Sequence, residues 1–120
     1  MSGQGSRTWF FPDGDLPEPG EVEPKGHESL LMLNPNDDDA EVVITVYFED
    51  REPATLAPQQ VGARRVRCIR TNEPIDGYQI PRGQYALRLE SSVPIVCQIG
   101  RLDVRQPNLA YYTVMGHAVD

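Results

Sequence analysis

The chain has 120 residues, the size of a single domain with a hydrophobic core of its own. Eleven prolines and ten glycines interrupt it, and no long segment free of them repeats its apolar residues with a helical period, which favours short strands and turns over helices. The formal charge of −7, from 11 basic and 18 acidic residues, repels phosphate backbones, so tight nucleic-acid binding is not expected.

The first strand and the loop after it are predicted from residues 7–26. Residues 7–11 are aromatic and β-prone, and they run into Pro12-Asp13-Gly14, a combination typical of a turn. Residues 13–26 hold several prolines and glycines, so we expect a loop there. Residues 27–33 then predict a second strand.

The clearest strand signal follows the turn predicted at residues 34–39. Residues 40–50 alternate with a period of two and are rich in β-branched side chains, which is typical of a strand with one buried face. The side chains expected on the buried face are Val42, Ile44, Val46 and Phe48.

A second alternating segment covers residues 63–71. Val66 and Cys68 share one face of this predicted strand, and Arg65 and Arg67 share the other. Cys68 and Cys97 both fall in the middle of an apolar strand and outside any CxxC motif. A disulfide between them is one alternative, but we expect two buried free thiols.

The C-terminal half is predicted to hold three strands after a turn region at residues 74–83. The first has Tyr85, Leu87 and Leu89 on its inward face and is broken by Ser91-Ser92-Val93-Pro94. The second, residues 95–104, is apolar on both faces over its first half, as expected for a strand covered on both sides. Residues 109–118 predict the last strand.

These elements add up to about seven short strands separated by turn clusters, a pattern typical of sandwiches and jelly rolls. We therefore predict an all-β protein with a single antiparallel β-sandwich domain, jelly-roll-like, over residues 1–120. No signal-peptide core occupies residues 1–7, and no apolar run approaches the roughly 20 residues of a membrane span. We expect a cytoplasmic protein that is not embedded in a membrane.

Motifs for catalysis and for cofactor binding are missing from the sequence. It contains no G-x-S-x-G, P-loop, GxGxxG or HExxH motif, and its two histidines, His27 and His117, are too few for a histidine-based metal site. Asp37-Asp38-Asp39 lacks the spacing of a calcium loop and is interpreted as an acidic hairpin tip. We predict that the protein is not an enzyme and has no catalytic residues, metal or cofactor.

The one basic cluster contains Arg64, Arg65, Arg67 and Arg70. A strand would divide these arginines between its two faces, and no aromatic residues alternate with them to stack on bases. A solvated face, or protection of an edge strand against pairing, is favoured over binding of an anion or nucleic acid.

Charged residues also lie at the ends of apolar strands. His27 and Glu28 open one such strand, Arg64 continues the face of Val66, and Arg101 and Asp103 continue an apolar face. Charges stay near a core only when they are paired. They could form a structural ion-pair network, a subunit contact or the floor of a polar ligand site, and the structural interpretation is favoured.

The same residues carry a resemblance that extends over nearly the whole chain with near-constant spacing. The sequence resembles the sensory rhodopsin transducer family in the order and spacing of a series of short motifs. The motifs are Arg7-Thr8-Trp9, His27-Glu28, Leu33-Asn34, Ala40-Glu41-Val42, Tyr47-Phe48-Glu49-Asp50-Arg51-Glu52-Pro53, Ala63-Arg64-Arg65, Ser91-Ser92-Val93-Pro94-Ile95-Val96-Cys97-Gln98, Arg101-Leu102-Asp103 and Arg105-Gln106.

The resemblance implies a jelly-roll-like sandwich that assembles as a cytoplasmic homotetramer. The family's named member relays light signals from a membrane-bound rhodopsin and has been associated with DNA binding, and its fold is similar to carbohydrate-binding modules. Two functions follow as expectations. One is binding of a small polar ligand such as a carbohydrate; the alternative is signal transduction through a membrane photoreceptor or another protein partner. The acidic balance and the N-terminal loop depart from the photosensory relative and argue against DNA binding.

The candidate polar residues, whether they bind a ligand or support the structure, combine the resemblance with the charged strand ends. They are His27, Glu28, Asn34, Arg64, Arg101 and Asp103.

Overall fold

The computed structural model describes residues 4–104 and 109–119, so the Arg105-Gln106 motif lies outside the described residues. Within these two ranges there are nine strands and no helix, and every strand pairing is antiparallel, which confirms the all-β prediction. The strands are β1 (Ser6–Leu16), β2 (His27–Asn34), β3 (Ala40–Tyr47), β4 (Ala54–Thr55), β5 (Gln59–Val61), β6 (Arg65–Arg70), β7 (Gly83–Asp103), β8 (Ala110–Met115) and β9 (His117–Val119).

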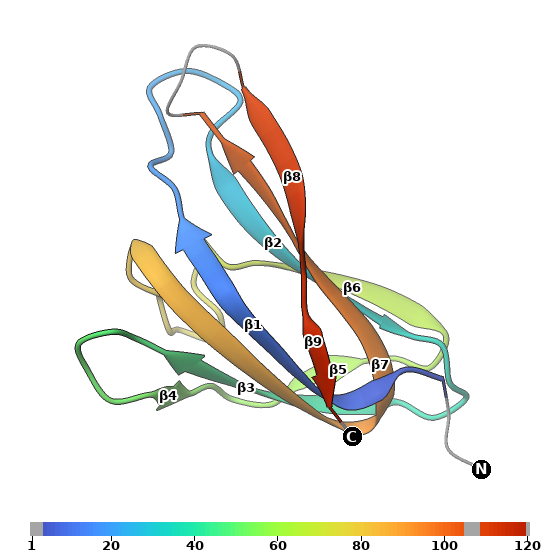
Figure 1. Cartoon of the computed structure of the whole chain (residues 1–120). Coiled ribbons are helices and arrows are strands. Elements are labelled where there is room, and N and C mark those ends of the chain that lie inside the picture. The colour runs from blue at the N-terminus through green and yellow to red at the C-terminus, as the bar shows by residue number, and fades with distance from the viewer. Residues whose placement is uncertain (1–3, 105–108, 120) are drawn as a thin grey trace.

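Two layers of strands are joined by the long strand β7, which runs through both (Figure 1). Its first part, residues 83–91, pairs with β1 and β3 in a layer completed by β4, β5 and β9, called here the first sheet. Its second part, residues 96–103, pairs with β2 and β8 in a layer completed by β6, called here the second sheet. This arrangement agrees with the predicted sandwich.

The predicted break at Ser91-Ser92-Val93-Pro94 is wrong, because β7 continues through it. Ser6 of β1 lies opposite Ile95, whereas Thr8 lies opposite Glu90, so β7 has extra residues at this point. Such an irregularity lets a strand turn the corner from one sheet to another, and a proline fits where ladder hydrogen bonds are interrupted. The Ser91-Ser92-Val93-Pro94 motif therefore marks the corner at which β7 passes from one sheet to the other.

The predicted turn at Pro12-Asp13-Gly14 is a bulge, and β1 continues to Leu16 instead of giving way to a loop at residue 13. Phe11 lies opposite Leu87 and Gly14 opposite Tyr85, so β1 carries one extra residue in between. A Cβ atom at Gly14 would lie 2.5 Å from Cζ of Tyr85. The glycine is thus needed because the tyrosine ring packs directly on the backbone.

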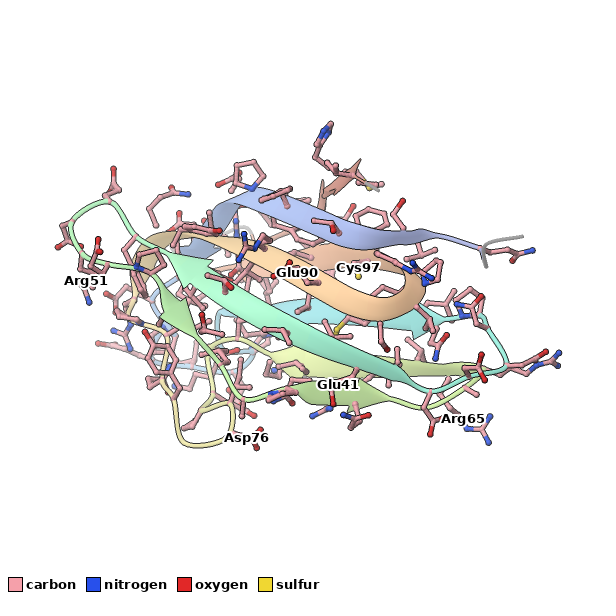
Figure 2. All side chains as sticks on the ribbon, turned by 90° about the horizontal axis from the view of Figure 1, so that it is seen from below. Glu41, Arg51, Arg65, Asp76, Glu90 and Cys97 are labelled. Atoms are coloured by element: carbon pink, nitrogen blue, oxygen red, sulfur yellow. The ribbon has the colours of Figure 1, made fainter. Side chains whose placement is uncertain are left out.

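The core lies between the sheets and contains the predicted inward faces of residues 40–46 and 85–89, while Phe48 is half-buried against it. Both cysteines are free, as predicted, and Cys97 is buried; Figure 2 shows its sulfur inside the sandwich. Burial raises the pKa of the Cys97 thiol to about 12. Cys68 is exposed, contrary to the prediction, because Ile69 is the residue of β6 that points inward.

The predicted strand over residues 109–118 is two short strands that lie on different sheets. β8 pairs with β7 on the second sheet, and β9 pairs with β1 on the first. Between them Gly116 lies against the Phe11 and Trp9 rings, where a Cβ atom would be 2.6 Å from Cζ of Phe11. This C-terminal segment therefore connects the edges of both sheets.

The described residues contain no helix that is long and apolar enough to cross a bilayer.

Candidate functional site

The centre of the polar cluster is the fully buried carboxylate of Glu28 on β2. Its Oε1 accepts hydrogen bonds from the Tyr85 hydroxyl and, at 3.4 Å, from the Thr71 hydroxyl. Its Oε2 accepts from Nε of Arg101 at 2.7 Å and from the backbone N–H of Asp15 at 3.1 Å. Four donors thus replace the water that this carboxylate gave up on folding, as a buried charge requires.

Arg101 on β7 is 4% exposed and lies directly opposite Glu28 in the strand register. One Nη2 hydrogen bond of 2.6 Å goes to the Asp13 backbone carbonyl, and Nη1 donates to the Tyr112 hydroxyl at 3.1 Å. The guanidinium also lies over the Tyr112 ring, 5.3 Å from its centroid. Burial opposes the charge, but the hydrogen bonds to Tyr112 and Glu28 outweigh it and raise the Arg101 pKa above its ordinary value.

Tyr85 on β7 completes the cluster from the first sheet. Its hydroxyl donates to Glu28 and lies 3.2 Å from Oγ1 of Thr71. Burial, followed by the adjacent negative charge of Glu28, holds the Tyr85 pKa well above its ordinary value, so the phenol stays neutral and keeps its proton for donation. The cluster therefore contains the buried Arg101–Glu28 ion pair, a longer 3.7 Å pair between Arg101 and the exposed Asp13 carboxylate, and neutral hydroxyls. It joins both sheets.

The other candidates near this end of the sandwich flank the cluster. His27 precedes Glu28 and so points to the opposite face of β2, where its Nδ1 lies 2.9 Å from the Lys25 carbonyl oxygen. Asp103 is the last residue of β7, partly exposed and opposite Ala110 of β8. Two of the six candidates, Glu28 and Arg101, are thus brought into direct contact.

Asn34 and Arg64 lie at the other end of β2 from Glu28, roughly 20 Å from it at the usual rise per residue of a strand. Asn34 is buried and organises the following turn, since its Nδ2 donates to the Asp38 and Val61 carbonyl oxygens at 2.8 and 3.1 Å. Arg64 is exposed and pairs with Asp37 at 2.8 Å. Although the sequence groups Arg64 with Arg101 as a candidate polar residue, Arg64 lies apart from it, because the face of β6 that it continues points to solvent.

Sequence reasoning missed four members of the cluster: Asp13, Thr71, Tyr85 and Tyr112. The sequence predicts Tyr85 on the inward, apolar face of its strand, but a tyrosine on a buried face needs a partner for its hydroxyl. That need for a partner is the sequence signal by which Tyr85 could have been assigned to the polar cluster. Asp13 and Thr71 carried none, since they contribute through a bulge and a strand end that only the fold brings together.

The outer face of the second sheet is a further candidate site, because it is apolar and exposed. Val66, Leu33 and Val96 form a row across β6, β2 and β7, and Val66 is 63% exposed. No Asp or Glu side chain lies on this face within the described parts of β2, β6, β7 and β8. The next row across the four strands is Cys68, Leu31, Gln98 and Met115.

Two adjoining clefts open at the end of the sandwich that holds the Glu28 cluster. Their volumes are about 330 and 570 Å³, within the range typical of small-molecule sites. Both are lined by Pro19, Gly26 and Asn72. Among residues 4–104 and 109–119, no group of three His, Cys, Asp or Glu side chains is placed to hold a metal ion.

The two-layer antiparallel sandwich, with its internal polar cluster and exposed apolar sheet face, places the chain in the class of small all-β sandwich domains. The sequence matches the family model described as Anabaena sensory rhodopsin transducer over residues 4–118. The chain belongs to this family, which confirms the resemblance read from its motifs.

Solved structures agree with this assignment. The crystal structure of Thermotoga maritima 1070 is 33% identical over 97% of each chain, with a TM-score of 0.84. The Anabaena sensory rhodopsin transducer is 38% identical, covers 89% of this chain and 96% of its own, and has a TM-score of 0.75. No curated protein matches the chain.

Proposed function

We propose that this chain is a non-enzymatic binding and adaptor protein that works as a cytoplasmic homotetramer. The observation that carries the proposal is the exposed apolar outer face of the second sheet. One face of an antiparallel sheet is normally polar, and contiguous exposed apolar patches mark interaction surfaces.

A second copy of the chain is the favoured occupant of that face because of charge. Each copy carries a formal charge of −7, so contact through most of the surface would bring carboxylates together. The described part of the apolar face contains Arg70 and no carboxylate. Two such faces meet without acidic repulsion and bury their apolar side chains.

Light scattering during size exclusion tests the assembly. The expected mass is about 54 kDa, four times the 13.4 kDa chain. Leu33→Glu places a carboxylate in the centre of the face and should yield smaller species, whereas Val22→Glu, an equally apolar-to-acidic change at an exposed loop position, should leave the tetramer intact. A wild-type monomer at micromolar concentration rejects the homotetramer.

As a second candidate function we propose binding of a small polar ligand such as a carbohydrate. The supporting observation is the pair of clefts next to the Glu28 cluster. The cluster itself is too deeply buried to touch a ligand, so we infer that Glu28 and Arg101 are primarily structural. A thermal-shift screen against sugars and phosphorylated sugars tests the function, since ligand at 100 times its Kd adds about 2.7 kcal/mol of stability.

The alternative is a signal transducer that contacts a membrane photoreceptor or another protein partner. It is supported by the family, whose Anabaena member is named for transduction from a sensory rhodopsin. Tight DNA binding is not proposed: Arg64 is paired with Asp37, and Arg67 donates to the Gln59 side chain and the Gln60 carbonyl. Fluorescent duplexes titrated at 150 mM salt test this, and sub-micromolar sequence-selective binding would contradict it.

A further inference from the structure

The clefts beside the Glu28 cluster share one polar side chain, that of Asn72. The smaller cleft lies between the β1–β2 loop and the residues just before β7, with Pro17, Gln79 and Pro81 in its wall. The larger one continues past the other side of Asn72 and has Lys25, Arg70 and Glu73 at its rim. Asn72 therefore lines both of these adjoining clefts.

The Asn72 side chain lacks a hydrogen-bond partner for its carbonyl oxygen. Oδ1 is buried, and no donor among the described residues reaches it. Buried side-chain oxygens are nearly always paired in native structures, and exceptions call for an explanation. A ligand hydroxyl in the cleft would supply the missing donor once rotation of the amide turns Oδ1 toward the cleft.

The walls of the cleft are held in place before any ligand arrives. Gln79 donates its side-chain N–H to the backbone carbonyl oxygens of Asn72 and Ile80 at 3.3 and 3.0 Å. The Gly26 backbone N–H donates to the Pro19 backbone carbonyl at 2.8 Å. Three lining residues follow or precede a residue of the Glu28 cluster in the chain: Leu16, His27 and Asn72 are neighbours of Asp15, Glu28 and Thr71. The buried cluster thus fixes the backbone of the cleft, which lowers the ordering cost of binding.

The charges at the rim define the class of ligand. Lys25 and Arg70 carry positive charge, and Glu23 and Glu73 carry negative charge, so the larger cleft has no excess of either sign. In the smaller cleft the charge of Arg82 is balanced by its ion pair with Glu18 at 2.6 Å. An anionic ligand would face the two carboxylates, and a cationic ligand would face the two basic groups. Donors and acceptors together suit hydroxyl groups, which do both, while the prolines offer apolar surface to C–H groups.

We propose that the two adjoining clefts bind a small neutral polyhydroxylated molecule, such as a neutral mono- or disaccharide, with Asn72 as the central hydrogen-bonding residue. The inference rests on the proposed binding of a small polar ligand and adds its site and its charge class. No described residue donates to Oδ1 of Asn72 in the free protein, and we therefore assign this side chain a role in binding.

The test compares ligand-induced shifts in melting temperature, and then affinities by calorimetry, for the full chain and two variants. The probes are neutral hexoses and disaccharides, the matching hexose 6-phosphates and the matching hexosamines. We expect the neutral sugars to raise the melting temperature most. Asn72→Ala should weaken their affinity at least tenfold while leaving the melting temperature of the free protein unchanged or raised, since it removes an unpaired buried oxygen. The control is Gln60→Ala, an exposed amide on β5.

Three results would overturn the proposal, and they differ in what else they reject. If sugars bind equally well to wild type and Asn72→Ala, the site lies elsewhere but the proposed ligand-binding function stands. If only sugar phosphates or hexosamines bind, the charge class is wrong. If no probe binds, the ligand-binding function falls as well, whereas the tetramer is judged separately by light scattering.

Discussion

Glu28 and Arg101 lie opposite each other on neighbouring strands, β2 and β7, and their side chains meet at 2.7 Å with both groups withdrawn from solvent. A buried ion pair of this kind adds little net stability over an apolar pair, but removal of one partner leaves an uncompensated buried charge. The contribution of this pair to stability is therefore measured by removing one of its two partners.

Arg101→Ala should lower the free energy of unfolding by about 3–5 kcal/mol, because it strands the Glu28 carboxylate. Urea denaturation followed by tryptophan fluorescence measures the change. Arg64→Ala, which breaks an ion pair whose side chains are 73% and 82% exposed, is the matched control and should leave stability nearly unchanged. An Arg101→Ala protein with wild-type stability and assembly would show that the cluster is not structural.

Tyr112→Phe should destabilise the protein by about 1 kcal/mol, since it removes the hydroxyl that accepts from Arg101 while retaining the ring over the guanidinium. The loss should be concentrated in β8, which Tyr112 connects to the buried pair. Amide hydrogen exchange checks this: exchange in residues 110–115 should accelerate more than in β3. Tyr47→Phe, on the outer face of the first sheet, provides the comparison. Uniform acceleration would argue against a local role.

Stability should fall at alkaline pH through Tyr85. Its pKa is raised in the folded state, so its contribution is complete below the ordinary value of about 10 and is lost as the pH rises through the folded value. The unfolding free energy, measured from pH 8 to 11, should decline above pH 10. Tyr85→Phe should be less stable at pH 8, because Glu28 loses a donor, but should show a shallower decline. An equal slope in both proteins would contradict the assignment.

The two thiols should differ sharply in reactivity. Cys97 is buried with a pKa near 12, so it should resist Ellman's reagent in the native protein at pH 8. Cys68 lies on the apolar face proposed to be covered in the tetramer, so it should react slowly in wild type and rapidly in Leu33→Glu. Stopped-flow absorbance measures both rates. Rapid reaction of Cys68 in an intact tetramer would move the subunit contact to another face.

The strands were predictable wherever a period of two runs along one buried face, as in residues 40–46 and 85–89. The errors have physical causes. Pro94 was read as a break because proline interrupts a ladder, yet a corner between sheets needs just such an interruption. The inward face of β6 was predicted wrongly, because Val66 and Cys68 are apolar and yet face outward.

The candidate site was predictable only in part, for a related reason. Glu28 and Arg101 are conspicuous as charges in apolar strands, so sequence alone indicates them and their need for pairing. Tyr85 and Thr71 approach Glu28 across 57 and 43 residues of chain, a proximity that the topology creates. The cleft lies between loops that have no periodic signal, so Asn72 could not be singled out.

The sharing of β7 by both layers also governs when the protein can fold during its synthesis. β1 is made first, yet its only strand partners among the described residues are β7 and β9, near the other end of the chain. On the ribosome, β1 must therefore remain unpaired while β2 through β6 emerge. The first sheet lacks its central strand until residues 83–91 have left the exit tunnel, and the second sheet lacks it until residues 96–103 have done so. Long-range pairing of this kind slows folding and prolongs exposure of aromatic segments such as Trp9-Phe10-Phe11. The nascent chain is thus most vulnerable to aggregation at its N-terminal strand.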